Sequence, residues 1–279
     1  MNTATATHPT DRPGSQRRYR ACALLAGLLP LLLGTTLTMA HSAHAGTDPL
    51  LAPTPYEATY QARSHGMRTD AYRYLRANDD GVFEVSHGLS VSVLGANLIT
   101  VEETSQFRWA DHGAVPVWYT FDQTGVRRRH EHVTFDWDAL QAAVDTDRGE
   151  YQTDIHQGVL DNLSFSAQMS AELYSRASPD AHPLAIDQVL TFQMVDRAEI
   201  DVHDYRVVAY ETIETLVGDL DTVRLQRVRA PDSSRSTEIW LATDYEFVLA
   251  RLVQTESGGS RTELILKSFE QNPALTATD

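Results

Sequence analysis

Glu211-Thr212-Ile213-Glu214-Thr215-Leu216-Val217-Gly218-Asp219-Leu220-Asp221-Thr222-Val223 is the stretch that decides the fold. It contains two runs rich in β-branched residues, and a turn built on Gly218-Asp219 joins them. Because glycine adopts a positive φ without steric cost, this dipeptide can supply the backbone conformation that a tight hairpin needs. The stretch therefore predicts an antiparallel β-hairpin, and nothing between Tyr205 and Phe269 has the periodicity of a helix.

The same alternation of apolar and polar residues extends through most of the chain. It is clearest from Phe83 to Val93, where apolar residues alternate with small and polar ones. Turn sequences rich in Gly, Asn and Asp separate such runs at regular spacing, which is typical of an antiparallel meander. We expect strands at 56–62, 69–76, 83–93, 100–109, 115–121, 128–137, 140–144, 151–155, 188–194, 205–216, 221–228, 237–242, 247–254 and 261–269.

One segment, Asp161 to Ser175, has the pattern of a helix. Asp161 can act as its N-cap, and apolar residues follow on one face at three- and four-residue spacing: Leu163, Ala167, Ala171 and Tyr174. The predicted fold class is therefore mostly β, an antiparallel curled sheet or half-barrel of many short strands with one main helix across its concave side or in its open end. Phe247 to Val253 is apolar on both faces, so it is either covered on both sides or lines an apolar cavity.

The first 45 residues have the three parts of a secretory signal peptide. Four arginines lie between Arg12 and Arg20, the apolar run Ala21 to Ala40 follows, and Ala43-His44-Ala45 has the A-x-A cleavage pattern. We predict export with cleavage after Ala45; the alternative is an uncleaved membrane anchor, since the run is almost long enough to span a bilayer. Residues 46–55 are expected to form an extended leader, 56–270 a single antiparallel β domain and 271–279 a disordered tail.

Composition excludes several kinds of site. The single cysteine, Cys22, lies inside the apolar run, so the processed chain can form no disulfide, thiolate metal site, cysteine nucleophile or lipid-bearing N-terminal cysteine. The first 45 residues contain four arginines and one aspartate, so the remaining chain carries 19 basic and 37 acidic side chains, a formal net charge of −18. Such a charge repels phosphate backbones and anionic head groups, so we expect no nucleic-acid partner and no charge-driven docking on a membrane. After cleavage of the signal peptide we also expect no transmembrane segment.

A first candidate site is a pair of histidines with an aspartate. His130, His132 and Asp136 fall on one face of a predicted strand, where the two imidazoles are close enough to share a metal ion. The alternative interpretation is a solvated strand face beside Arg127-Arg128-Arg129. A lone H-x-H pattern lacks a committed third ligand, so the metal site is the weaker interpretation.

A second candidate site combines a histidine with aromatic residues. His87 interrupts an apolar face and is either a base in a pocket or a hydrogen-bonded core histidine. The aromatic residues that recur on strands either line a groove for a hydrophobic ligand or pack in the core, and the candidates for ligand binding are His87, Trp118, Phe135, Trp137 and Trp240. No nucleophile motif and no phosphate-binding glycine loop occurs in the sequence. We therefore predict no catalytic residue, no cofactor and a protein that is not an enzyme.

Several segments, taken in their order along the chain, resemble one family. They are Tyr56-Glu57-Ala58-Thr59-Tyr60, Phe135-Asp136-Trp137, Gly158 to Ser164, Glu214 to Thr222, and Ile239 to Ala242 followed by Phe247 to Arg251. In this order they resemble the secreted bacterial proteins grouped as domain of unknown function 3108. The resemblance implies an exported, mostly antiparallel β protein of Gram-negative bacteria, hence a periplasmic location, with no established activity and no catalytic residues to carry over.

These features lead to three hypotheses of function. The first is non-enzymatic binding of a hydrophobic small molecule, a lipid or another envelope component by a curved sheet that the helix partly closes; by fold analogy such a sheet is similar to periplasmic lipid and lipoprotein carriers. The second is a scaffold for envelope biogenesis that binds a protein partner and no ligand. The third is a hydrolase that uses His130, His132 and Asp136 with a metal ion.

Overall fold

The computed structural model describes residues 49–93, 96–177 and 182–271. The predicted signal peptide, residues 1–45, lies outside the described residues, as do residues 46–48 of the leader and 272–279 of the tail.

Every predicted strand segment overlaps an observed strand, and the two-residue strand β9 was not predicted. The elements are β1 (Tyr56–Ser64), β2 (Met67–Ala77), β3 (Val82–Val93), β4 (Ala96–Ala110), β5 (Gly113–Gly125), β6 (Arg129–Asp136), β7 (Gln141–Thr146), β8 (Gly149–Asp154), β9 (Val159–Leu160), α1 (Ser164–Arg176), β10 (Val189–Asp196), β11 (Glu199–Thr215), β12 (Gly218–Arg227), β13 (Ser236–Ala242), the single 3₁₀ turn η1 (Thr243–Tyr245), β14 (Val248–Thr255) and β15 (Arg261–Gln271).

All these strands belong to one sheet with the order β8-β7-β6-β5-β4-β3-β2-β1-β15-β14-β13-β12-β11-β10-β9. Two meanders, β1 to β8 and β10 to β15, join where the first strand pairs with the last, and β8 and β9 at the two ends leave the sheet open. Neighbouring strands are antiparallel except β9 and β10, which are parallel. The predicted fold class, a curled and mostly antiparallel sheet with one main helix, is confirmed.

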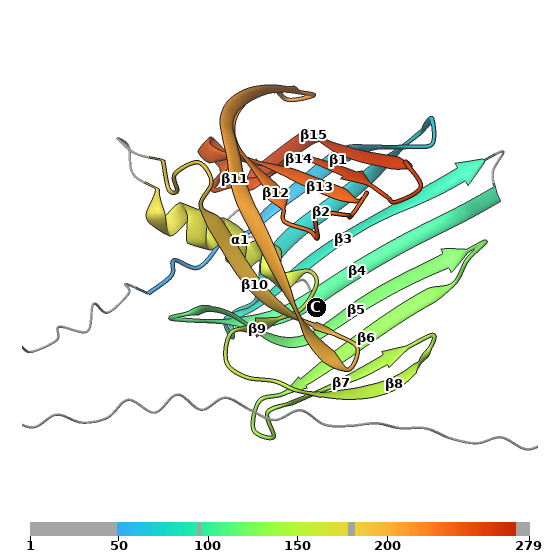
Figure 1. Ribbon diagram of the computed structural model, residues 1–279, viewed down its shortest axis with the longest axis vertical. Helices are drawn as coiled ribbons and strands as arrows, with labels where there is room; N and C mark the ends of the chain where they lie inside the picture. The colour runs from blue at the N-terminus through green and yellow to red at the C-terminus, as the bar shows by residue number, and fades with distance from the viewer. Residues whose placement is uncertain (1–48, 94–95, 178–181, 272–279) are drawn as a thin grey trace, which may run out of the picture. The chain divides into compact units, whose positions relative to one another are not determined.

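The sheet curls around α1, which contacts both meanders (Figure 1). Ser166 of the helix accepts a hydrogen bond from the guanidinium of Arg73 on β2, and the Ser170 hydroxyl donates to the carbonyl of Phe247, 2.8 Å away, just before β14. The far ends of the sheet also meet, because Thr153 Oγ1 on β8 donates to the carbonyl of Arg197 in the β10–β11 turn at 2.6 Å. These contacts hold the helix against the inner face of the sheet and bring its two ends near each other.

A buried aspartate starts the helix. Asp161 Oδ1 accepts hydrogen bonds from the backbone N–H groups of Leu163 and Ser164 at 2.8 and 2.7 Å, and Oδ2 accepts one from the Ser105 hydroxyl of β4 at 2.7 Å. These bonds satisfy N–H groups that the first turn of a helix leaves without partners. The predicted N-cap at Asp161 was wrong in position, because the helix begins at Ser164 and its N-cap is Leu163. Asp161 lies two residues before the N-cap, and its carboxylate still accepts from the Leu163 and Ser164 N–H groups.

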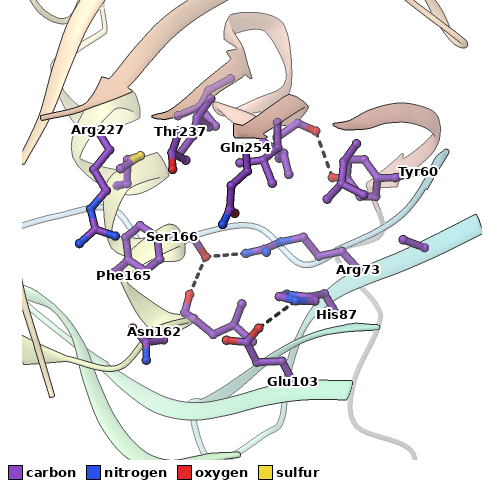
Figure 2. Close-up of a pocket in the computed structure, with 18 of the residues that line it drawn as sticks. Tyr60, Arg73, His87, Glu103, Asn162, Phe165, Ser166, Arg227, Thr237 and Gln254 are labelled. Atoms are coloured by element: carbon purple, nitrogen blue, oxygen red, sulfur yellow. Dashed lines mark hydrogen bonds and ion pairs between the residues drawn. The ribbon is translucent and has the colours of Figure 1, made fainter. Parts of the chain in front are cut away.

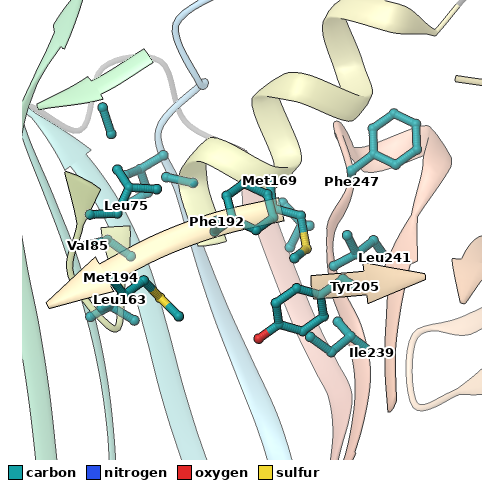
Figure 3. Packing of buried hydrophobic residues seen from close by; sticks show 14 of the residues in the cluster. Leu75, Val85, Leu163, Met169, Phe192, Met194, Tyr205, Ile239, Leu241 and Phe247 are labelled. Atoms are coloured by element: carbon teal, nitrogen blue, oxygen red, sulfur yellow. The ribbon is translucent and has the colours of Figure 1, made fainter. Parts of the chain in front are cut away.

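Tyr174 was predicted to lie on the apolar face of the helix and so to be buried. It is instead 41% exposed. The helix lies between two meanders, so its buried surface is wider than one stripe and includes Ala167, Met169, Ala171 and Leu173. Figure 3 shows Met169 beside Phe192 of β10, with Tyr205 of β11 close by. No helix in the described ranges is long and apolar enough to cross a membrane.

The hairpin predicted from residues 211–223 is present as β11 and β12, but its turn is displaced. Thr215 pairs with Gly218, so the turn residues are Leu216 and Val217, and the predicted turn at Gly218-Asp219 was wrong by two positions. Gly218 still has a φ of +114° as the first residue of β12. The Thr215 hydroxyl accepts from the Val217 N–H and donates to the Gly218 carbonyl, and these local bonds fix the turn ahead of the glycine.

We predict that Gly125→Ala destabilises the fold by about 1–3 kcal/mol. Gly125 ends β5 with a φ of +105°, and a Cβ atom there would lie 2.1 Å from the backbone carbonyl oxygen of Leu98. Urea denaturation measures the change in the free energy of unfolding. Gly258→Ala is the matched control, because a Cβ at Gly258 meets nothing within 4 Å; equal effects of the two variants would contradict the prediction.

We predict a pH-dependent contribution from Asp161. Burial raises the pKa of this carboxyl to about 6, although its hydrogen bonds from Ser164, Ser105 and Leu163 oppose the shift. Because the folded pKa lies above the unfolded one, ionisation costs stability as pH rises through this interval. The stability of the wild type relative to Asp161→Asn should fall by roughly 2–3 kcal/mol between about pH 4 and about pH 7. Urea denaturation across this range tests it, and parallel curves for the two proteins would refute it.

Candidate functional site

A cavity of about 420 Å³ lies between α1 and the inner face of the curled sheet. Its lining comes from both meanders, with β1 to β4 on one side and β10 to β15 on the other, and α1 lies across it (Figure 2). Small-molecule sites in proteins usually measure roughly 300–1,000 Å³. The cavity therefore has room for one small ligand.

Three cross-strand pairs of β13 and β14 form one wall of the cavity. In order along the strands they are Thr237 with Gln254, Ile239 with Leu252, and Leu241 with Leu249. Leu264 of β15 lies opposite Leu252 and extends the middle pair across a third strand. The wall is thus polar at one end and aliphatic along the rest of its length.

A register shift makes this wall continuous. Leu249 and Leu252 are three residues apart, so in a regular strand they would point to opposite faces of the sheet. Between Trp240 and Leu241 the partner on β14 moves from Arg251 to Leu249, which leaves Ala250 as the extra residue of a bulge. Both leucines consequently line the cavity. The sequence left two interpretations of Phe247 to Val253 open, a strand covered on both sides or one that lines an apolar cavity. Its inner face, with Leu249 and Leu252, lines the cavity.

Three arginines, Arg227, Arg229 and Arg235, line the polar end of the cavity, and we call them the arginine cluster. Arg227 ends β12 opposite Tyr205, whereas Arg229 and Arg235 lie in the connection between β12 and β13. Arg229 Nη2 donates to the Thr237 hydroxyl at 3.2 Å, which ties the cluster to the polar pair of the wall. The cavity thus has a cationic end that adjoins its aliphatic part.

A second polar group lies on the other side of the cavity, where Arg73, His87 and Glu103 are cross-strand neighbours on β2, β3 and β4. His87 Nε2 lies 2.9 Å from Glu103 Oε2, and the Tyr119 hydroxyl donates to Glu103 Oε1 at 2.7 Å. Arg73 Nε donates to the Tyr56 hydroxyl at 2.8 Å, and its Nη2 reaches Ser166 of the helix (Figure 2). This network joins the sheet to the start of α1.

The network keeps Glu103 ionised. Burial raises the pKa of this carboxyl, but the charge of His87, hydrogen bonds from His87 and Tyr119 and the charge of Arg73 together hold the pKa below its usual value. Burial and the adjacent Glu103 carboxylate raise the pKa of the Tyr119 hydroxyl well above its usual value. Tyr119 therefore stays protonated and donates, so the carboxylate is compensated on both oxygens.

Three of the hydroxyl groups around the cavity, those of Tyr60, Ser166 and Ser170, have partners in the protein. The Tyr60 hydroxyl donates to the Leu249 carbonyl at 3.0 Å, and the Ser170 hydroxyl donates to the Phe247 carbonyl at 2.8 Å. Ser166 accepts from Arg73 and donates to the Leu163 carbonyl. These side chains hold the helix on the sheet, and none of the three donates to a neighbouring histidine or carboxylate that could activate it as a nucleophile.

Of the five residues predicted to bind a ligand, His87 lines the cavity. The four aromatic candidates lie elsewhere and make packing or hydrogen-bonding contacts. Trp118 donates to Gln106, Trp137 donates to the Pro116 carbonyl at 2.6 Å, and Phe135 stacks on Trp137 with ring centroids 5.9 Å apart. Trp240 points to the other face of β13, where its indole N–H donates to Glu211.

The three residues of the predicted metal site lie on the same face of β6 but are separately engaged. His130 and His132 have ring centroids 5.5 Å apart, and each faces a different carboxylate: Asp145 for His130 at 3.5 Å and Asp122 for His132 at 3.1 Å. Asp136 accepts from the backbone N–H groups of Asp138 and Ala139 and so holds the following turn. Within the described ranges, no group of three or more His, Cys, Asp or Glu residues is arranged to hold a metal ion.

Sequence reasoning did not find the arginine cluster, and it placed Leu249 and Leu252 only within a segment that either is covered on both sides or lines a cavity. Arg227, Arg229 and Arg235 have no common periodicity because a loop separates them, so their proximity depends on how β12 and β13 pair. Alternation could have assigned Ile239 and Leu241 of β13 to one face of the sheet. It could not have done so for Leu249 and Leu252 of β14, because a bulge lies between them.

Comparisons with known proteins agree with this fold. The family model "Protein of unknown function (DUF3108)" matches residues 56–265. A β-barrel-like protein of the domain of unknown function DUF1849 from Brucella abortus has a similar structure, with a TM-score of 0.50 and 9% identity over 80% of this chain and 99% of that chain. A protein from Parabacteroides distasonis, described as a candidate lipoprotein, is also similar at a TM-score of 0.32 and 9% identity, over 80% of this chain and 100% of that chain. No sequence among the curated proteins matches this chain.

We predict that Glu103→Gln lowers the free energy of unfolding by about 2–4 kcal/mol at neutral pH, because it leaves the positive charge of Arg73 without its nearby carboxylate. The pKa of the Glu103 carboxyl is lower in the folded than in the unfolded protein, so its ionised form stabilises the fold at pH values above the unfolded pKa. The difference in the free energy of unfolding between the wild type and Glu103→Gln should therefore shrink as pH falls below about 4. Urea denaturation at both pH values measures it. The exposed neighbour Glu102 provides the control Glu102→Gln, and a Glu103 deficit that is unchanged by pH would contradict the ionic explanation.

Proposed function

We propose that this chain, which belongs to the DUF3108 family, is a non-enzymatic binding protein that holds a hydrophobic ligand in the cavity between α1 and the inner face of its sheet. The observation that carries the proposal is the aliphatic wall formed by β13, β14 and β15. Burying an apolar group there gains about 25 cal/mol for each Å² removed from water, which is the usual source of affinity for such ligands.

The state of the polar groups supports binding over catalysis. The hydroxyls of Tyr60 and Ser170 bond to backbone carbonyls, and the Glu103 carboxylate is compensated by His87 and Tyr119. Polar groups whose hydrogen-bonding capacity is already filled by the protein stabilise the structure around the cavity. They are not arranged as activated nucleophiles. A ligand that is mostly apolar leaves these bonds intact.

The expected site of action is the periplasm. The signal-peptide pattern of the first 45 residues supports export, and the cysteine-free processed chain suits an oxidising compartment without needing disulfides. In that compartment the ligand would be a hydrophobic small molecule, a lipid or another apolar component of the envelope. A carrier for such molecules needs a cavity inside a stable sheet.

Native mass spectrometry of the protein purified from its own periplasm tests the proposal, together with organic extraction. We expect a bound mass that extracts as a lipid or another apolar molecule. A protein that arrives empty and also fails to bind dodecanol in solution would overturn the binding function. That result would favour the scaffold that binds a protein partner.

We predict that Leu264→Trp weakens binding of dodecanol about tenfold or more. The larger ring occupies part of the cavity, and overpacking costs about 1–3 kcal/mol, where 1.4 kcal/mol corresponds to a factor of ten. Isothermal titration calorimetry measures the affinity. Ile265→Trp is the matched control, because Ile265 is the next residue of β15 and does not line the cavity; a loss of the same size in both variants would count against the assigned site.

A further inference from the structure

The arginine cluster stands out against the charge of the rest of the protein. The chain after residue 45 has a formal net charge of −18, yet three guanidinium groups line one end of the cavity. Like charges gathered at one place repel each other, and partial burial makes that repulsion stronger. A cluster of arginines is stable when nearby carboxylates neutralise its positive charge. Where the carboxylates neutralise only part of that charge, the cluster favours binding of an anion.

The acidic groups near the cluster are already shared. Asp201 lies 3.6 Å from Arg227 Nη2 and 2.8 Å from His203 Nε2, and Glu256 lies 3.0 Å from Arg235 Nε. Gln254 also donates to Glu256. Two carboxylates therefore serve two arginines and a histidine.

Arg229 is the arginine of the cluster that forms no ion pair with these carboxylates, although the charge of Glu256 acts on it from a longer distance. It bonds to the Thr237 hydroxyl, and no carboxylate of the described residues lies within salt-bridge distance of it. Its Nε atom is buried without a hydrogen-bond partner. Burial and the neighbouring charges of Arg227 and Arg235 lower the pKa of Arg229, so an anion at this position would relieve an unfavourable interaction.

The polarity of the cavity wall changes in one direction away from the cluster. Thr237 and Gln254 form the pair at the cluster, and the next pairs along the strands are Ile239 with Leu252 and Leu241 with Leu249. At about 3.3 Å per residue, the four steps along the strand from Thr237 to Leu241 span roughly 13 Å. A ligand that matches this wall has a charged group at one end and an apolar chain of about that length behind it.

We propose that the arginine cluster binds the anionic head group of a single-chain amphiphile, a carboxylate or a phosphate, while its apolar chain occupies the aliphatic part of the cavity. The inference rests on the proposed binding function and assigns its ligand class and orientation. Guanidinium groups suit both head groups, since their planar donors form paired hydrogen bonds with carboxylate and phosphate oxygens. A cavity of about 420 Å³ favours one chain over a lipid with two.

The other cation at the cavity, Arg73, does not serve this role. Its donors already bond to Tyr56 and Ser166, and the Glu103 carboxylate supplies a negative charge nearby. An anionic head group at that end would be repelled by Glu103. The ligand is therefore oriented with its head group at the β12–β13 connection.

Calorimetric titration of the processed chain with four probes tests the proposal: dodecanoate, dodecyl phosphate, dodecanol and inorganic phosphate. Dodecanoate or dodecyl phosphate should bind at least about tenfold more tightly than dodecanol, because a charge-assisted hydrogen bond adds to the same apolar contact. Added salt should reduce this advantage. Inorganic phosphate alone should bind far more weakly, since it lacks the chain.

Arg229→Gln should abolish most of the preference for the anionic probes, measured as the ratio of their affinities to that of dodecanol in the same variant. Arg229→Lys, which retains the charge, should keep part of it. Arg68→Gln is the control, because Arg68 is exposed on β2 outside the cavity. Should Arg229→Gln fail to fold, Arg227→Gln and the salt dependence of the wild type give the same readout.

The outcomes separate this inference from the function on which it rests. Equal affinities for dodecanoate, dodecyl phosphate and dodecanol would overturn the head-group site and leave hydrophobic binding intact. Inorganic phosphate binding as tightly as dodecyl phosphate would also overturn it, because the chain would then contribute nothing. If none of the chain-bearing probes binds, both the inference and the binding function fail.

Discussion

The pairing of β1 with β15 brings the first and last strands of the fold together, and the rest of the structure depends on it. Through it two separate meanders become one sheet, and Ala62 and Leu264, which are distant in the sequence, become neighbours. Closing so long a loop costs conformational entropy, which the ladder of hydrogen bonds and the core must offset. Without this pairing the two walls of the cavity would not belong to one rigid surface.

The helix converts that curled sheet into a cavity with a defined interior. Asp161 holds the start of α1 against β4, while Arg73 holds its first turn against β2. Both anchors bury charge, which is costly unless every lone pair and proton finds a partner. The helix therefore stays at a fixed height above the sheet, and the space beneath it is left for a ligand.

Several features could be predicted from residues that are neighbours in sequence. Alternation identified the strands, and Asp161 with its three- and four-residue spacing identified the helix. The failures have two causes. At the hairpin, one local signal overrode another, because the Thr215 hydroxyl bonds fix the turn ahead of Gly218. For β14 and α1 the cause is pairing and packing with other segments: the bulge at Ala250 reverses the faces of β14, and Tyr174 is exposed although it shares the predicted apolar face.

The sequence by itself determined the fold class, the absence of cysteine after Cys22 and the sign of the net charge, because each of these depends on composition or on short-range periodicity. It also showed the family resemblance, through the order of short motifs along the chain. It also singled out His87, one member of the cavity lining. The tertiary structure alone decided that Arg227, Arg229 and Arg235 meet at one end of an aliphatic wall and that Trp118, Phe135, Trp137 and Trp240 lie away from it. The reason is that a cavity is made of side chains from many strands, and their meeting depends on strand order, register and bulges, which no single stretch of the chain encodes.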